Sequence, residues 1–171
     1  MYTLDKIEIQ FKGICAKAGV SCNVPITINS RLTRTLGRVV INNSIGATDT
    51  WKPIKVEFSK QFIETSSDAS IEDVIKHEAA HFIATSRTGE DHGHNAYFKS
   101  ICAEIGTTND GTTTKVERTV DESSLYKYAI YCDTCNKVIG GKSRMCRTIK
   151  EIKFCTCKTC NTSNLRVIQN W

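Results

Sequence analysis

Two histidines stand four residues apart in the segment HEAAH, which runs from His77 to His81 with Glu78 between them. In an α-helix this spacing places both imidazoles on one face, one turn apart, where both can reach a single metal ion. Glu78 is rotated by about 100° from His77, so its carboxylate flanks the ion without having to ligate it. Zinc lowers the pKa of its bound water toward neutrality, and a carboxylate beside it can accept the proton. The pattern therefore predicts metal-assisted hydrolysis; two solvated histidines on a polar helical face are the alternative.

A catalytic zinc site needs a third protein ligand and leaves one position for water. Candidates follow the expected helix after a turn, so the chain can fold back and present them: Glu90, Asp91, His92 and His94. We select His94 as the third ligand, and the alternative is His92, which otherwise is a solvated loop residue or supports a ligand. The longer pattern HExxHxxGxxH is not met, because Ala84 and Arg87 occupy its glycine and last histidine positions.

Two Cys-x-x-Cys pairs near the C-terminus have the spacing of a zinc ribbon. Their members are Cys132, Cys135, Cys157 and Cys160. Four thiolates fill the coordination shell of zinc, so this second ion would be structural and would stabilise a segment with little core of its own. Cys155 lies beside the second pair, but the two-residue gap favours Cys157 with Cys160. Two local disulfides are the alternative, which a reducing compartment disfavours.

The cationic excess of the chain lies in the same C-terminal segment. Residues 1–120 hold equal numbers of acidic and cationic side chains, so the whole net charge of +5 falls in residues 121–171. The cations between and around the cysteine pairs are Lys137, Lys142, Arg144, Arg147, Lys150, Lys153 and Lys158. Aromatic residues are interleaved with them, a pattern that suits a phosphate backbone and stacked bases. We interpret this basic segment as a nucleic-acid interface; a solvated positive face is the alternative.

The elements expected to position these residues are mixed. Apolar spacings of three and four predict helices over 4–18, 71–86 and 95–105. Runs rich in Val and Ile predict strands over 24–29, 37–42, 53–59, 126–131, 137–140, 149–154 and 165–169. Ser70 and Asp73 have capping-box spacing, Gly89 can end the second helix, and 107–114 has the composition of a loop or linker. We expect an α+β fold with helices packed on a small sheet over 1–120, followed by a small basic unit over 121–171.

Composition and local patterns also limit the location of the protein. No apolar run approaches the about 20 residues of a membrane helix, so we expect no membrane association. The first residues lack a basic and then apolar signal pattern, so we expect a cytoplasmic, nucleoid-associated or nuclear protein that is not secreted. We expect Cys15, Cys22 and Cys102 to be small buried apolar residues, Cys155 to be a spare thiol beside the second pair, and Cys146 to be a free thiol without function.

The order of HEAAH at 77–81, GHNAYFK at 93–99 and the two cysteine pairs resembles the SprT-like zinc metalloproteases, which include Spartan. The resemblance covers residues 4–169. In that family a histidine after the HExxH helix is the third zinc ligand and an aromatic residue follows it; here Phe98 follows His94 by four residues, which favours His94. Asn95 stands where the family pattern has glycine.

The resemblance implies a zincin-like metalloprotease domain at 1–120 and a four-cysteine zinc ribbon at 121–171. His77, His81 and His94 would hold a catalytic Zn²⁺, Glu78 would be the general base, and the two cysteine pairs would hold a structural Zn²⁺. The implied activity is endoproteolysis of DNA-associated proteins, including proteins crosslinked to DNA, with the basic ribbon as the DNA contact. Two alternatives are a general metallopeptidase with a purely structural ribbon and a non-enzymatic zinc-dependent DNA-binding protein. No pattern in the sequence indicates an oligomeric state.

Overall fold

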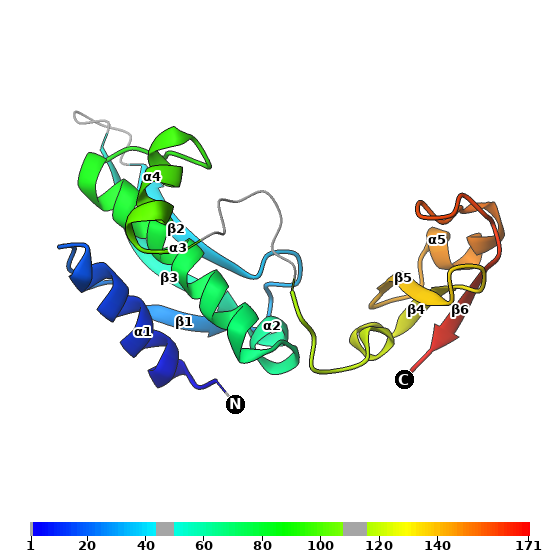
Figure 1. The fold of residues 1–171 in the computed structure, drawn as a ribbon. Coiled ribbons are helices and arrows are strands. Elements are labelled where there is room, and N and C mark those ends of the chain that lie inside the picture. Colours follow the sequence, from blue (N-terminus) through cyan, green and yellow to red (C-terminus); the bar gives the residue numbers. More distant parts are fainter. Residues whose placement is uncertain (1, 44–49, 108–115) are drawn as a thin grey trace. The chain divides into compact units, whose positions relative to one another are not determined.

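The computed structural model describes residues 2–43, 50–107 and 116–171. The chain divides into two compact units, Met1–Glu117 and Arg118–Trp171 (Figure 1). The elements of the N-terminal unit are α1 (Leu4–Lys17), β1 (Ile26–Asn29), β2 (Gly37–Asn43), β3 (Trp51–Ser59), α2 (Lys60–Thr65), α3 (Asp68–Thr88) and α4 (Ala96–Glu104). Those of the C-terminal unit are η1 (Glu122–Leu125), β4 (Tyr128–Cys132), β5 (Lys137–Lys142), α5 (Arg147–Lys150), η2 (Ile152–Phe154) and β6 (Leu165–Gln169).

The N-terminal unit is built on a three-stranded sheet with the order β1-β3-β2. β1 pairs with β3 in parallel, β2 pairs with it antiparallel, and β2 has an irregularity between Val40 and Ile41. The long helix α3 packs against β2 and β3, and α1 and α4 pack against α3. Figure 1 shows α3 crossing one face of the sheet with α1 beside it. The histidine motif therefore lies on the helix that contacts most of the unit.

The core of this unit fixes α3 through aromatic and branched side chains. Phe11 of α1 meets Phe58 of β3 and Phe82 of α3 edge-on, with ring centroids 6.4 and 5.6 Å apart. Ile75 and Ile83 of α3 are fully buried in the same cluster. Burial of such side chains stabilises a fold by about 1.5–3 kcal/mol each, so α3 is a firm support for functional groups.

Most predicted elements of the N-terminal unit are confirmed, and two details differ. The predicted capping box at Ser70 is wrong: Ser67 caps α3 and accepts from the Ser70 N–H, while the Ser70 hydroxyl accepts from the Glu117 N–H at 2.8 Å. The helix therefore begins earlier, at Asp68. The predicted end is confirmed, because Gly89 takes the left-handed conformation at φ 71°. The short α2 was not predicted, since six residues do not define a helical period. Of the loop expected over 107–114, residues 108–114 lie outside the described residues.

The C-terminal unit holds a three-stranded antiparallel sheet with the order β5-β4-β6. The strand predicted over 149–154 is wrong, because this stretch forms the helical turns α5 and η2. Its apolar residues Ile149 and Ile152 are three apart and pack on Tyr128 and Ile130 of β4, which a helical turn allows and an extended strand does not. Among the described residues of the whole chain, no helix is long and apolar enough to cross a membrane.

Candidate metal centres

Three histidine nitrogens converge beside α3. His77 and His81 extend from one face of α3, and His94 comes from the turn before α4. The Nε2 atom of His81 lies 3.2 Å from that of His77 and 3.1 Å from that of His94, and the third Nε2 separation is 3.3 Å. The structure thus brings together the two motif histidines and the histidine selected from the following turn.

This donor set fits one zinc ion. Tetrahedral ligands at a Zn–N distance of about 2.0–2.1 Å lie about 3.3 Å from one another, close to the observed separations. A neutral imidazole has one donor and one acceptor nitrogen, so three Nε2 atoms facing one another cannot all be satisfied by mutual hydrogen bonds. Burial, together with neighbouring His77 and His94, lowers the pKa of His81 to about 3, which favours the neutral form that a ligand must have.

Phe98 of α4 supports all three imidazoles. Its side chain is fully buried. Its ring stacks on His81 with centroids 4.2 Å apart and an angle of 28°, and it lies 5.2 Å from His77 and 5.0 Å from His94. Packing on one rigid ring restricts the imidazole rotamers, so the metal-binding geometry does not depend on the metal alone.

His92 lies outside the three-histidine cluster but braces the turn that carries it. Asn95 caps α4, with its Oδ1 accepting from the Phe98 N–H at 3.1 Å, so its amide nitrogen is free to donate to His92 Nδ1 at 3.2 Å. His92 Nε2 lies 2.7 Å from Thr88 Oγ1 near the end of α3. The His92 ring also contacts Tyr97 at 4.6 Å. His92 therefore connects the end of α3 to the start of α4, on either side of His94.

Glu78 is held against the edge strand β2. Its side chain is buried, and burial raises the pKa of its carboxyl to about 8, opposed by a hydrogen bond from the Val39 backbone N–H. β2 can approach so closely because residue 37 is glycine: a Cβ there would lie 2.8 Å from Glu78 Cγ and 3.1 Å from its Oε1. A hollow of about 300 Å³ is lined by Gly37, Arg38, Val39, Ile41, His77, Glu78, His81, Asp91 and His94. The carboxylate and the three histidines thus face one open space.

Gly37, Val39, Thr88 and Asn95 were not among the predicted site residues. Gly37 had a usable signal, because a glycine at the start of a strand pattern marks a close approach of another group. The hydrogen bond from the Val39 N–H to Glu78 had no signal in the sequence, because almost any residue at that position offers a backbone N–H and the contact depends on tertiary packing.

The sequence model of the SprT-like family matches residues 8–121. The chain belongs to the SprT-like family. This family is associated with metallopeptidase-type activity. No curated protein and no solved structure gives a match to the chain. The matched residues include the three histidines, Glu78 and the strand that covers it, so the candidate metal centre is part of the SprT-like region.

A second cluster lies beyond the residues matched to the SprT-like family and holds the four cysteines Cys132, Cys135, Cys157 and Cys160. The Sγ atoms of Cys132 and Cys160 are 3.6 Å apart, and those of Cys135 and Cys157 are 3.8 Å apart. Zinc–sulfur bonds of about 2.3 Å in a tetrahedron separate the sulfurs by about 3.8 Å, so the set is compatible with a zinc ribbon. Cys155 is not part of the cluster.

The electrostatics of the four thiols also favour a cation among them. Backbone N–H groups of Cys160 and Thr159 lower the pKa of Cys157 to about 6, which favours its thiolate. A hydrogen bond with Cys160, followed by burial and by hydrogen bonds with Cys157 and Cys132, raises the pKa of Cys135 to about 12, so without a cation this thiol stays protonated beside Cys157. A divalent cation would remove this conflict and allow all four to ionise.

Both cysteine pairs share a local sequence and a local backbone. Each reads Cys-x-Thr-Cys-Asn, and the asparagines Asn136 and Asn161 have φ of 54° and 56°. This left-handed conformation is one that asparagine adopts more readily than most residues, and it turns the chain after the second cysteine. Thr162 and Thr134, which flank the cluster, are hydrogen-bonded at 3.2 Å. The prediction of a zinc ribbon used only the spacing of the cysteines, and the repeated pentapeptide is a further signal in the sequence for the same site.

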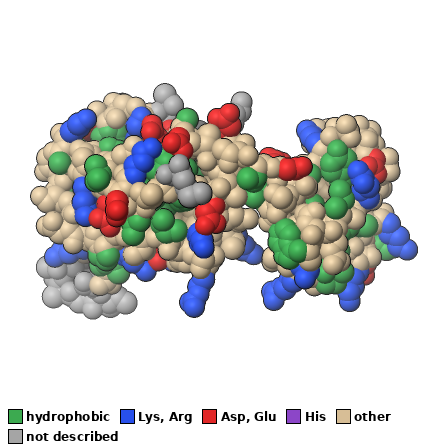
Figure 2. Space-filling view, turned by 90° about the horizontal axis from the view of Figure 1, so that it is seen from below, with side chains coloured by type: hydrophobic (Ala, Val, Ile, Leu, Met, Phe, Trp, Pro, Cys, Tyr) green, Lys and Arg blue, Asp and Glu red, His purple; other side chains and the backbone are tan. Residues whose placement is uncertain are grey.

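The seven cations of the basic segment are all exposed, and two of them contact neighbouring side chains. Arg147 is paired with Glu151 at 2.7 Å, and Lys153 lies 5.0 Å above the ring of Phe154. Lys137 and Lys158 line one hollow beside the cysteine cluster. Figure 2 shows Lys and Arg side chains at several separate places around the C-terminal unit. The surface is cationic, and two of its lysines share a concave site.

Proposed function

We propose that this SprT-like chain is a zinc-dependent metalloendopeptidase with a zincin-like N-terminal unit. His77, His81 and His94 would hold the catalytic Zn²⁺, and Cys132, Cys135, Cys157 and Cys160 would hold a structural Zn²⁺. The observation that carries the proposal is the convergence of three Nε2 atoms and the buried Glu78 carboxylate on one open hollow. Three histidines leave a fourth position of a tetrahedral ion accessible, as catalysis requires.

When bound, Zn²⁺ supplies Lewis acidity that polarises a carbonyl and lowers the pKa of a coordinated water. Glu78 would accept the proton of the attacking water and deliver it to the leaving amine. A carboxyl whose pKa is raised by burial can hold and release a proton near neutral pH, which suits this role. The Val39 N–H orients the carboxylate, and Phe98 keeps the three imidazoles in place.

The test is the variant Glu78→Gln, which keeps the side-chain shape and removes the base. We expect unchanged zinc content by mass spectrometry and a loss of casein cleavage of about 10²–10⁴-fold. The matched control is Glu90→Gln, an exposed carboxylate near the same turn that does not line the hollow, and it should cleave at the wild-type rate. Wild-type cleavage by Glu78→Gln contradicts the role of Glu78 as the base, whereas a zinc-loaded wild type that cleaves nothing favours the non-enzymatic alternative.

We further propose that the C-terminal unit binds DNA and directs proteolysis to DNA-associated proteins, including proteins crosslinked to DNA. Support comes from the exposed cations of the C-terminal unit and from membership of the SprT-like family. Two observations favour the second candidate, a general metallopeptidase with a structural ribbon: Lys and Arg side chains lie at several separate places on the face of the unit in Figure 2, and Arg147 is paired with Glu151. The salt dependence of DNA binding separates these two functions.

A further inference from the structure

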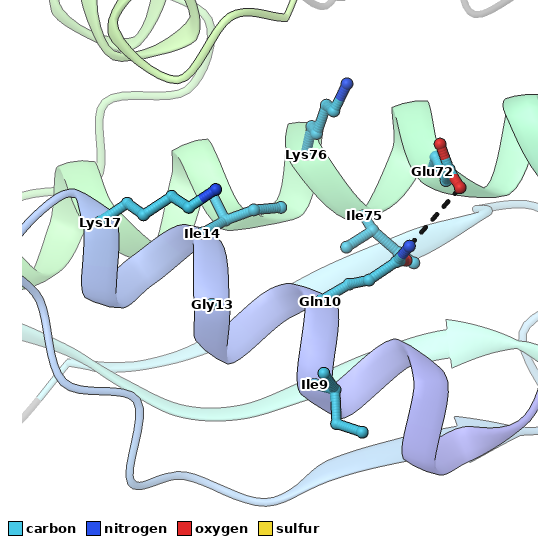
Figure 3. A pocket seen from close by; sticks show the side chains of 8 residues that line it. All are labelled: Ile9, Gln10, Gly13, Ile14, Lys17, Glu72, Ile75 and Lys76. Carbon is cyan, nitrogen blue, oxygen red and sulfur yellow. Dashed lines mark hydrogen bonds between the residues drawn. The ribbon is translucent and has the colours of Figure 1, made fainter.

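A groove runs between α1 and α3, away from the residues of the metal centre (Figure 3). It is a hollow of about 270 Å³ lined by Ile9, Gln10, Gly13, Ile14, Lys17, Glu72, Ile75 and Lys76. A second hollow of similar volume shares Ile14, Lys17 and Lys76 with it and continues to Glu104 and Ile105. The two therefore form one continuous α1–α3 groove, and it has no lining residue in common with the hollow of the three histidines.

The wall and floor of this groove are apolar and unfilled. Ile9 leaves 73% of its surface exposed, and Ile14 and the buried Ile75 continue the apolar surface. Gly13 lies inside α1, where glycine lowers helix stability relative to alanine. A Cβ at Gly13 would meet nothing within 4 Å, so the packing of the described residues does not require glycine there. The missing side chain leaves a place where another backbone can approach α1.

The charges of the groove are not balanced within the described part of the chain. Lys17 and Lys76 line both hollows, and neither forms an ion pair with a described residue. Of the acidic side chains that line the groove, Glu104 is paired with Arg87 through two 2.7 Å bonds, and Glu72 accepts from the neutral groups Tyr2 Oη at 2.7 Å and Gln10 Nε2 at 3.5 Å (dashed line in Figure 3). The groove thus offers two ammonium groups, Lys17 and Lys76, against one carboxylate without a cationic partner among the described residues, Glu72, and it keeps an excess of positive charge beside apolar surface.

We propose that the α1–α3 groove binds an acidic amphipathic helix of a partner protein. Its apolar side chains would pack on Ile9, Ile14 and Ile75, its backbone would approach Gly13, and an acidic side chain would lie between Lys17 and Lys76. The groove follows α1 from Ile9 to Ala18, about 14 Å at 1.5 Å per residue, which matches about three turns of a bound helix. An interface of this length is small, so the complex is transient.

The probe is a fluorescein-labelled, lactam-bridged helix of about 14 residues, with leucines at i, i+4 and i+7 and glutamates beside them. A reference peptide carries lysines in place of the glutamates. Titrated with the full zinc-loaded chain in a fluorescence anisotropy assay, the acidic helix should bind with a Kd of about 100 µM or tighter and at least about tenfold more tightly than the reference. Lys17→Glu with Lys76→Glu should reverse this preference.

Gly13→Gln is the steric test, because it fills the groove without meeting another group. The Gly13→Gln variant should bind the acidic helix at least about tenfold more weakly than the wild type, while the thermal unfolding midpoint of the variant stays at or above that of the wild type. Ile54→Gln, at an exposed isoleucine of β3, is the control and should not change binding. Absent binding, equal affinity for both peptides, or indifference to Gly13→Gln each overturns the proposal. A dimer in sedimentation velocity that Gly13→Gln abolishes would assign the groove to a second copy instead.

Discussion

His92 shows how one side chain outside the donor set can decide the geometry of the metal centre. Because Asn95 donates to His92 Nδ1, the ring proton lies on Nε2 and is donated to Thr88 Oγ1, whose hydroxyl donates to the Ala84 carbonyl at 3.0 Å. A single neutral tautomer satisfies every bond in this chain. The turn that carries His94 is therefore braced at both ends before a metal binds.

We predict that His92→Ala weakens zinc binding without removing a ligand. Groups that support metal ligands contribute about 10–100-fold to affinity, so we expect a loss of this size in a chelator competition titration. At saturating zinc, His92→Ala should still hold two ions per chain, whereas His94→Ala should hold one. If His92→Ala loses an ion and His94→Ala keeps both, the assignment of the third ligand is reversed.

At the scale of elements, the helices and strands with a clear apolar period were predictable from the sequence. Short elements and contacts between elements were not. The helix of HEAAH, its glycine end and the strands around Val39 and Val56 follow from local patterns that packing reinforces. The stretch at 149–154 has two isoleucines and a phenylalanine and was predicted as a strand, but Ile149 and Ile152 are three apart and pack on the small core of the C-terminal unit as helical turns. The cover of Glu78 by β2 depends on tertiary pairing, so the sequence predicted the carboxylate and not its burial.

One buried carboxylate, that of Glu57, connects the three strands of the sheet in the N-terminal unit. Glu57 of β3 accepts from Lys55 at 2.7 Å, from Arg38 of β2 at 2.6 Å and from Asn29 of β1 at 3.1 Å. The hydrogen bond from Lys55, followed by those from Arg38 and Asn29, lowers its pKa to about 2 against the opposing effect of burial. A lowered folded-state pKa stabilises the fold above the unfolded value, and that stabilisation is lost as the pH falls from about 4.3 toward 2.

We therefore predict that Glu57→Gln lowers the free energy of unfolding at pH 7 by about 1–2 kcal/mol, since both cationic partners are partly exposed and can be rehydrated. The difference from the wild type should shrink toward zero near pH 2. Urea unfolding of both proteins at a series of pH values measures it. Glu64→Gln, at an exposed pair of α2, is the control and should change little. A difference that is constant with pH contradicts the role of the charge.

At the scale of the whole molecule, the two units differ in what stabilises them. The N-terminal unit has an extensive buried core, whereas the apolar cluster described in the C-terminal unit has three buried members, Tyr128, Ile130 and Ile149. A small core leaves much of the folding free energy to a structural metal. We predict that Cys157→Ser unfolds the C-terminal unit alone: hydrogen exchange should become fast in β4–β6 and stay slow in α3. Protection retained in β4–β6 would show that zinc is not required there.

At the scale of the two units together, the proposed DNA binding would join them in one function, and its salt dependence would report which cations take part. The logarithm of the affinity falls with the logarithm of salt concentration by about 0.9 per contacted phosphate in duplex DNA. Lys137 and Lys158 line one hollow, so Lys137→Gln with Lys158→Gln should weaken binding and reduce the slope by about 1–2. Arg166→Gln is the control, because Arg166 is already paired with Asp133 at 2.7 Å and lies over Tyr131. Fluorescence anisotropy of a labelled duplex, titrated at several salt concentrations from low to physiological, measures the affinity and the slope for each variant. A wild-type affinity that does not change with salt would favour a general metallopeptidase in which the ribbon is purely structural.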